Sequence, residues 1–254
     1  MNPRTLLSRI VLTSLLAAPF WIPAQVAAES APPRPDLAPA DTPDLEIQEA
    51  RVSYLEDLDL LVFEQRLAGR AGATVPQARG DIDGAPVLGY VFPTTLTPTD
   101  IGFGAGTGTV ALAVTAHPDF DDTPLWDENN DRRYDNDGIV FHSHWVVLVP
   151  DAGAPGGLAV ERLPEGAAAG VLPPTNPGMP MLMDSPGFPI LLQSSTLKVL
   201  VPAQRVNHKK DFRFDAVTAY MEVTTASGSP SLQVHRTYTV LSKDLSLPFE
   251  IQRR

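Results

Sequence analysis

The sequence predicts an all-β protein, built as a single antiparallel β-sandwich with long Pro/Gly-rich and acidic loops. Short apolar, β-branched runs recur along the chain and are separated by clusters of Pro, Gly, Asp and Asn. The 26 prolines and 18 glycines fit loops between strands better than they fit packed helices. No helical pattern of about 10–15 residues alternates with the strands, which argues against a parallel α/β sheet.

The N-terminal residues have the pattern of a secretory signal peptide over 1–28. Arg4 and Arg9 precede an apolar segment at 10–18 that is too short to span a bilayer, and small residues lead to a cleavage position after Ala28. No later apolar run is long enough to cross a membrane, so we expect no transmembrane segment after cleavage. The predicted location is periplasmic or secreted.

The rest of the chain divides into a leader and one β domain. Residues 29–44 are rich in Pro, Ala and Asp, lack periodicity and predict a disordered leader. The β-sandwich domain is expected over 45–254. Its first part is ambiguous: alternation favours two strands at about 46–55 and 59–68, and a single amphipathic helix is the alternative. Further strands are expected at about 87–92, 109–116, 139–149, 196–202, 213–224, 232–241 and 247–251.

Charge and cysteine content restrict the possible functions. The formal net charge is −11, and removal of the two signal-peptide arginines makes it −13, which argues against nucleic acid as a partner and is compatible with binding cations. The absence of Cys excludes thiolate zinc sites, cysteine nucleophiles and covalent haem attachment.

Potential oxygen ligands are concentrated in the acidic loop, residues 117–138. Alternating Asp and Asn side chains on tight turns are typical of Ca²⁺ sites, although the full EF-hand pattern is absent. The predicted ligands are Asp127, Asn129, Asp131, Asp135 and Asp137. The alternative is a solvated turn in which these side chains cap their own backbone, with part of the charge neutralised by arginines.

Potential imidazole ligands come directly after the acidic loop in the sequence. On a strand, His142 and His144 project from the same face, a spacing that lets both bind one Zn²⁺ or Cu²⁺. His117 ends the preceding predicted strand and reaches the pair if the two strands are neighbours, and Asp119 or Asp137 then completes the shell. The alternative is one buried, hydrogen-bonded histidine beside another on the sheet surface.

A second long loop, at about 163–190, contains Met179, Met181 and Met183. Thioether sulfur suits Cu(I), and together with the two histidines it indicates a copper-binding protein. The alternative is that these methionines fill irregular space in a packed loop.

The leading functional hypothesis is an exported, non-enzymatic binding or structural module for a divalent cation. The first alternative is a metal-dependent hydrolase or lyase that uses the His-x-His pair. The others are a periplasmic copper-binding protein and a Ca²⁺-stabilised carbohydrate-binding module with Trp126, Tyr134 or Trp145 as the stacking platform. Whether the protein is an enzyme, and whether a protein or glycan is its partner, stays open at this level.

Overall fold

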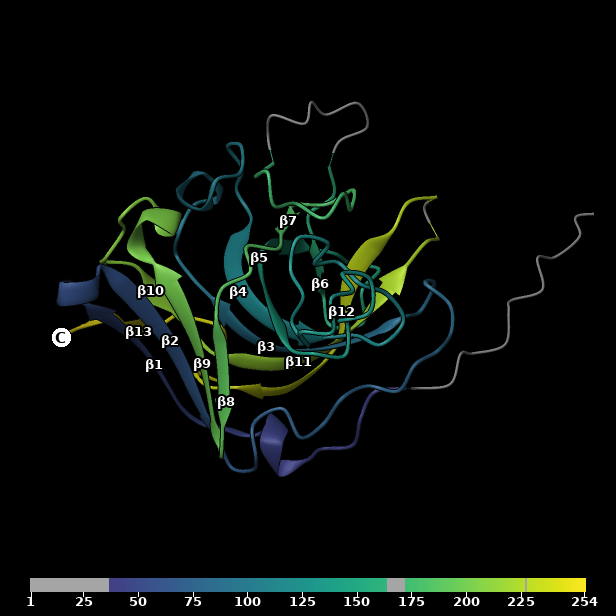
Figure 1. Ribbon diagram of the computed structural model, residues 1–254, viewed down its shortest axis with the longest axis horizontal. Coiled ribbons are helices and arrows are strands. Elements are labelled where there is room, and N and C mark those ends of the chain that lie inside the picture. Colours follow the sequence, from purple (N-terminus) through teal and green to yellow (C-terminus); the bar gives the residue numbers. More distant parts are fainter. Residues whose placement is uncertain (1–36, 164–171, 227) are drawn as a thin grey trace, which may run out of the picture. The chain divides into compact units, whose positions relative to one another are not determined.

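The computed structural model describes residues 37–163, 172–226 and 228–254 (Figure 1). Strands make up 41% of the described residues and helices 7%, so the predicted all-β class is confirmed. The signal-peptide prediction and the first part of the predicted leader, 29–36, lie outside the described residues.

One sheet has five strands in the order β14-β1-β2-β9-β8. Its strands are β1 (Ile47–Leu55), β2 (Leu60–Leu67), β8 (Ile190–Gln193), β9 (Thr196–Pro202) and β14 (Gln252–Arg253). β1 and β2 are an antiparallel hairpin joined through η2 (Glu56–Leu58), so the two-strand prediction is confirmed and the helical alternative is wrong.

The second sheet has the order β4-β3-β11-β12-β6-β5-β7, and an additional antiparallel pairing of β4 with β5 closes six of its strands into a barrel (Figure 1). Its strands are β3 (Pro86–Pro93), β4 (Thr109–Ala116), β5 (His142–Pro150), β6 (Leu158–Val160), β7 (Met183–Asp184), β11 (Val217–Thr224) and β12 (Ser231–Val240). The prediction of a single sandwich therefore holds only as far as its all-β class. The closing strand β6 has three residues, too few to show a strand pattern in the sequence.

The smaller elements connect these sheets. β10 (Arg213–Phe214) pairs with β13 (Phe249–Glu250), and η1 (Pro43–Leu45), η3 (Pro98–Ile101) and η5 (Ala203–Val206) are single turns of 3₁₀ helix. Among the described residues, none of the helices has the length and apolar character that a bilayer crossing requires.

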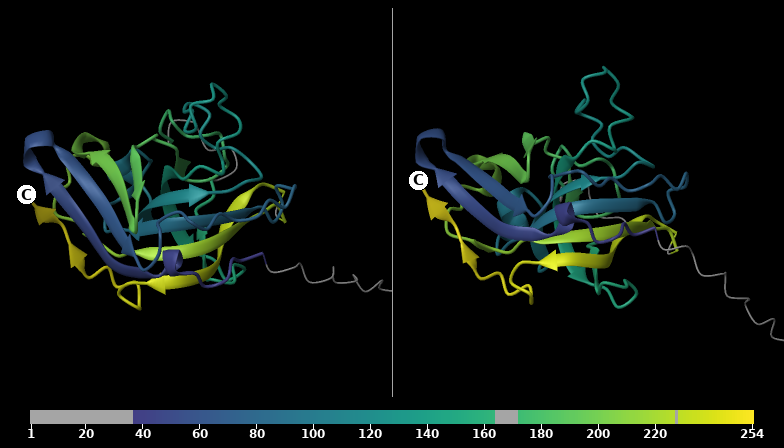
Figure 2. Two further views of the ribbon diagram at one scale, coloured as in Figure 1. Left: turned by 60° about the horizontal axis from the view of Figure 1, so that its bottom comes forward. Right: turned by 90° about the horizontal axis from the view of Figure 1, so that it is seen from below.

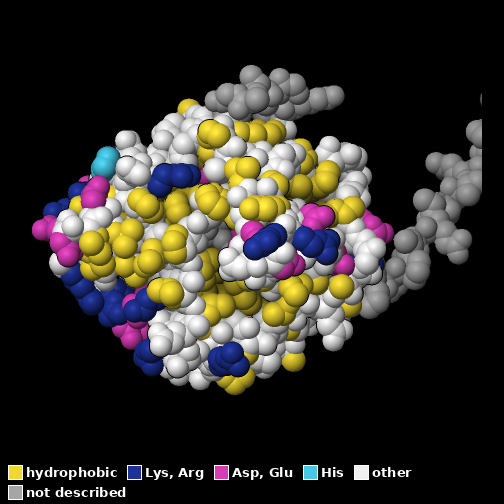
Figure 3. All heavy atoms as spheres, in the orientation of Figure 1, with side chains coloured by type: hydrophobic (Ala, Val, Ile, Leu, Met, Phe, Trp, Pro, Cys, Tyr) yellow, Lys and Arg dark blue, Asp and Glu magenta, His cyan; other side chains and the backbone are white. Residues whose placement is uncertain are grey.

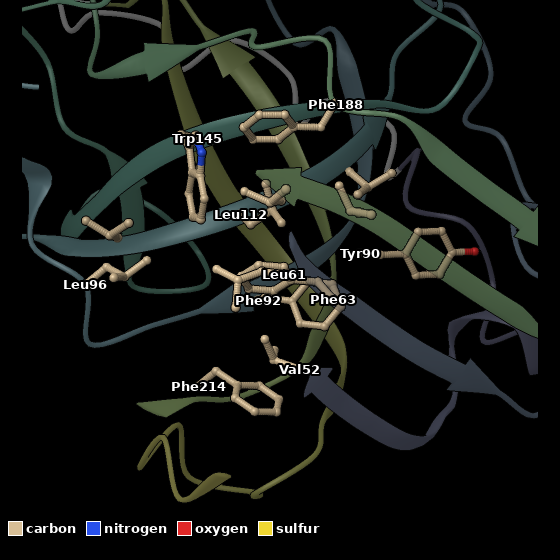
Figure 4. Close-up of a cluster of buried hydrophobic side chains, with 14 of the residues drawn as sticks. Val52, Leu61, Phe63, Tyr90, Phe92, Leu96, Leu112, Trp145, Phe188 and Phe214 are labelled. Atoms are coloured by element: carbon tan, nitrogen blue, oxygen red, sulfur yellow. The ribbon is translucent and has the colours of Figure 1, made fainter. Parts of the chain in front are cut away.

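Side-chain alternation gives the barrel wall two different faces. Tyr90 and Phe92 point out of the barrel into a core shared with the five-stranded sheet, where the ring of Phe63 lies 5.4 Å from that of Phe92 and 6.2 Å from that of Trp145 (Figure 4). The other side of the same strands belongs to a separate apolar cluster inside the barrel. These inward residues include Val87, Val91, Ala113, Val146, Ala219, Met221, Val223 and Val234.

Different segments lie at the two ends of the barrel. The acidic loop stands at one end, and the turn between β5 and β6 lies at the other together with the segment 241–248 (Figure 2). Residues 37–45 run along the outside of the domain, where Tyr238 donates a hydrogen bond to the backbone oxygen of Pro39 and Arg236 pairs with Asp41. This part of the predicted leader is thus held by specific contacts.

Candidate metal centre

The pairing of β4 with β5 brings three histidines together. Thr115 lies opposite His142 and Ala113 opposite His144, so His117, one residue beyond β4, continues along the same inward row. The loop that leaves His117 returns in contact with it: the His117 amide donates to the backbone oxygen of Gly138 at 2.6 Å. A Cβ atom at Gly138 would lie 2.1 Å from the Phe120 oxygen, so this close crossing requires glycine.

Asp122 completes a compact set with these histidines, which we call the His/Asp cluster (His117, Asp122, His142 and His144). One ligand atom from each residue lies within 4.8 Å of the others. Asp122 Oδ1 is 3.1 Å from His117 Nε2, 3.0 Å from His142 Nε2 and 3.5 Å from His144 Nε2. Four donors about 2.0–2.1 Å from a tetrahedral Zn²⁺ lie about 3.3–3.4 Å apart, so these separations fit one ion.

In each ring, a hydrogen bond of Nδ1 outside the cluster determines that Nε2 faces the centre. Nδ1 of His117 lies 2.9 Å from the backbone oxygen of Phe120, and Nδ1 of His142 lies 2.7 Å from that of Val140. Because a carbonyl oxygen only accepts, both Nδ1 atoms carry the hydrogen, and Nε2 of each neutral ring presents a lone pair. Such outer hydrogen bonds orient metal-binding histidines.

Ser185 orients the ring of His144 in the same way. Its hydroxyl donates to the backbone oxygen of Asp122 at 2.7 Å, so its oxygen is free to accept from His144 Nδ1 at 3.1 Å. His144 Nε2 therefore also presents a lone pair. Nε2 of His144 and Oδ1 of Asp122 are buried and have no hydrogen-bond partner among the described residues.

Burial contributes to the electrostatics of every member of the cluster, because all four residues are at most 4% exposed. The space-filling view agrees, because it shows no described histidine over the barrel on the face that carries the acidic loop (Figure 3). Burial lowers the pKa of His144 to about 3, so its ring is neutral at neutral pH. Burial raises the pKa of Asp122, but the three histidine rings around its carboxylate outweigh this effect, and the pKa lies well below its usual range.

His142 shows the opposite balance. Burial lowers the pKa of its ring, but the adjacent carboxylate of Asp122 raises it more, and the net pKa lies above the usual value. The buried carboxylate therefore stays charged and attracts a cation to the point where the lone pairs meet. A neutral imidazole and an ionised carboxylate are the forms that bind a metal ion.

The predicted calcium ligands do not join this cluster. Asp127 accepts hydrogen bonds from the amides of Asp131 and Arg132, and Asn129 accepts one from Asp131. Asp131 accepts from the Arg133 amide, and Asp135 forms an exposed ion pair with Arg133. Their oxygens are thus occupied by the loop's own backbone and arginines, as the alternative interpretation of this segment expects.

The two carboxylates suggested as partners of the histidines also have other roles. Asp119 accepts from the amides of Arg79 and Gly80. Asp137 is buried and accepts from the Glu128 amide, while one of its oxygens has no hydrogen-bond partner among the described residues. The carboxylate that the structure brings to the histidines is Asp122, which the sequence analysis did not single out.

The remaining candidates are not members of the His/Asp cluster. Met181 and Met183 are buried in the barrel interior. Trp145 is 1% exposed and belongs to the core, so it does not offer a stacking surface, whereas Trp126 and Tyr134 are exposed on the acidic loop.

The His/Asp cluster is assigned on geometry alone. Comparisons of the chain with protein-family models, with curated proteins and with solved structures find no match.

Proposed function

We propose that this protein binds one divalent transition-metal ion, with Zn²⁺ as its resident ion, at His117, Asp122, His142 and His144. The observation that carries the proposal is the 2.9 Å separation of His117 Nε2 and His142 Nε2. When both rings are neutral, both nitrogens present lone pairs, and the carboxylate oxygen beside them is also an acceptor. Three acceptors at such distances need a cation between them, either a proton on one ring or a metal ion, and the four converging donor atoms favour the metal ion.

The donor set supports Zn²⁺ over the two other ions expected from the sequence. Ca²⁺ prefers six to eight oxygen ligands, whereas this cluster offers three nitrogens and one carboxylate. Copper(I) favours sulfur donors, and the cluster contains none. Imidazole with carboxylate at tetrahedral spacing suits Zn²⁺.

The role of the ion is binding or structural in the first instance, because four protein donors fill a tetrahedral shell. One observation favours metal-dependent hydrolysis as a second candidate: His117, Asp122 and His144 also line the interior of the barrel. Hydrolysis needs a water on the ion, which requires a fifth coordination position.

We further propose that the protein acts in the periplasm or outside the cell. The signal-like pattern of residues 1–28 supports this. N-terminal sequencing of protein recovered from the exported fraction tests it. Glu29 as the first residue supports the proposal, and an intact N-terminus in the cytoplasmic fraction contradicts it.

Metal analysis of protein purified without a chelator or a histidine tag tests metal binding. We expect one equivalent of zinc in the natural chain and none in His117→Ala or His142→Ala. His208→Ala and His235→Ala are matched controls, because these two histidines lie outside the cluster. Equal metal content in all five proteins, or no metal in the natural chain after exposure to zinc, contradicts the proposal.

A further inference from the structure

The interior of the barrel contains a cavity of about 210 Å³. A cavity of about 150 Å³ lined by Leu, Ile and Phe stays dry and binds benzene, so this volume holds a ligand somewhat larger than benzene. The apolar walls come from β3, β11, β12 and the methionine segment. Typical wall residues are Val87, Val223, Val234, Met179, Met181 and Met183.

The cavity exists because three neighbouring strands carry small residues at inward positions. These are Gly89 on β3, Ala113 on β4 and Ala219 on β11. A Cβ atom at Gly89 would lie 3.0 Å from the Met221 side chain and 3.3 Å from that of Thr115, which shows that this glycine faces the interior. A barrel of this size with larger residues there would be filled by its own side chains.

The ionisable groups of the lining are gathered at one end. His117, Asp122 and His144 are the ionisable residues among the described lining residues. The Thr115 hydroxyl lies beside them, because Thr115 pairs with His142, and it is buried with no hydrogen-bond partner among the described residues. A ligand in this cavity therefore meets an apolar wall along its length, with the ion and one hydroxyl donor at its head.

The charge of the metal centre determines which head group a ligand in the cavity needs. A divalent ion with one aspartate and three neutral imidazoles leaves a net charge of +1 inside an apolar cavity, and a buried uncompensated charge is unfavourable. A single anionic oxygen donor in a fifth position neutralises it and can accept a hydrogen bond from Thr115. A carboxylate fits this requirement, and a neutral alcohol does not.

The opposite end of the cavity provides access. Thr109, Thr237 and Leu245 line the cavity there and are exposed. This end of the barrel is the one that carries the segment 241–248, away from the acidic loop (Figure 2). A ligand can therefore enter tail-last, with its polar head reaching the ion first.

We propose that the barrel interior is the binding site of a small apolar monocarboxylate, of about ten non-hydrogen atoms, whose carboxylate binds the ion held by the His/Asp cluster. This inference rests on the proposed metal binding and adds the class of ligand that the centre receives. Apolar burial supplies the affinity, and the ion with Thr115 supplies the selection for an anion.

Calorimetric titration of the zinc-loaded full chain with octanoate tests the inference, together with the visible spectrum of the Co²⁺-loaded protein. We expect saturable binding of one octanoate, at least about a hundredfold tighter than acetate because of the buried CH₂ groups. The Co²⁺ bands shift on binding, and octanol binds more weakly than octanoate. Octanoate binding that is equally tight in the metal-free protein, or an unchanged Co²⁺ spectrum, contradicts coordination to the ion.

Cavity-filling variants locate the site. Ala113→Leu and Ala219→Leu place extra carbons inside the barrel, and we expect either to weaken octanoate binding at least about tenfold while one equivalent of zinc is retained. Ala73→Leu, at an exposed position, is the matched control. If both filled variants bind octanoate as the natural chain does, the inference is wrong. A zinc-loaded natural chain that binds no octanoate overturns the inference and leaves metal binding intact, whereas a chain that takes up no zinc overturns both.

Discussion

Ser185 and His144 are joined by a hydrogen bond of 3.1 Å that determines which nitrogen of the histidine faces the other ligands. The same hydroxyl donates to the backbone of Asp122, so a single side chain positions two members of the cluster. β7 supplies the residue before Ser185, and its pairing with β5 holds the two segments together.

We predict that Ser185→Ala lowers zinc affinity by about 10–100-fold, the usual effect of removing an outer hydrogen bond from a metal-binding histidine. Competition with a chromophoric chelator measures this affinity. Ser246→Ala, at an exposed position, serves as the control. An affinity for Ser185→Ala within twofold of the control would show that this hydrogen bond does not orient His144.

The carboxylate of Asp122 is predicted to be essential. Asp122→Asn removes the only negative charge of the cluster and should lower zinc affinity by more than about a hundredfold, since outer-shell changes alone reach that size. Asp119→Asn is the matched control, because Asp119 contacts backbone amides outside the cluster. Equal affinities for the two variants, measured by the same competition, would count against Asp122 as a ligand.

The part of the acidic loop that carries the predicted calcium ligands, residues 127–137, is predicted to take no part in metal binding. Asp127→Asn with Asp131→Asn should leave zinc content at one equivalent, because these side chains hold the loop's own amides. Elemental analysis should find no stoichiometric calcium in the natural chain. A calcium equivalent that disappears in the double variant would restore the calcium hypothesis.

Zinc removal is predicted to destabilise the fold. At free zinc a hundredfold above the Kd, a ligand that binds only the folded state adds about 2.7 kcal/mol. For a domain of this size that is roughly 5–10 °C in Tm. Scanning calorimetry with and without a chelator measures the difference, and zinc should restore the higher Tm. His142→Ala should show no zinc-dependent change, and a zinc response equal to that of the natural chain would contradict the assignment.

The hairpin of β1 and β2 is expected to make a pH-dependent contribution to the free energy of unfolding. Arg51 lies 2.9 Å from Glu64 and Lys198 lies 3.4 Å from it. Burial raises the pKa of Glu64, but the hydrogen bond and charge of Arg51, with Lys198, lower it below its ordinary value of 4.5. A lowered pKa in the folded state stabilises the protein above that value, and the contribution is lost as the pH falls through the folded pKa.

Arg51→Met should therefore reduce the free energy of unfolding by up to about 1 kcal/mol at pH 7. The difference from the natural chain should shrink as the pH falls below 4.5. Urea unfolding at several pH values measures it. A difference that does not change with pH would mean that Arg51 acts through packing instead of charge.

The sequence was sufficient to predict most strands and the grouping of the three histidines, because both depend on patterns within short segments of the chain. Strand alternation fixes that His142 and His144 share a face, and the pairing of β4 with β5 is the simplest connection that places His117 beside them. Several strands start and end within a few residues of those expected, for example β4 at Thr109–Ala116 and β9 at Thr196–Pro202, whereas the short strands β6, β7 and β8 were not expected.

Asp122, the barrel and its cavity could not be predicted in the same way. The choice of Asp122 over Asp119 depends on where loop amides such as those of Arg79 and Gly80 lie, and these come from a distant part of the chain. Barrel closure depends on β6, which pairs with both β5 and β12 over a short length. The cavity follows from closure, because the inward face of β4, β3 and β11, with its small residues Gly89, Ala113 and Ala219, encloses a space only when the other strands complete the barrel.

The most direct test of the central claim is a crystal structure of the zinc-loaded chain with anomalous data collected on both sides of the zinc absorption edge. Our account predicts one anomalous peak about 2.0–2.1 Å from His117 Nε2, His142 Nε2, His144 Nε2 and Asp122 Oδ1. A peak at residues 127–137 instead, or no peak near the three histidines, would contradict it.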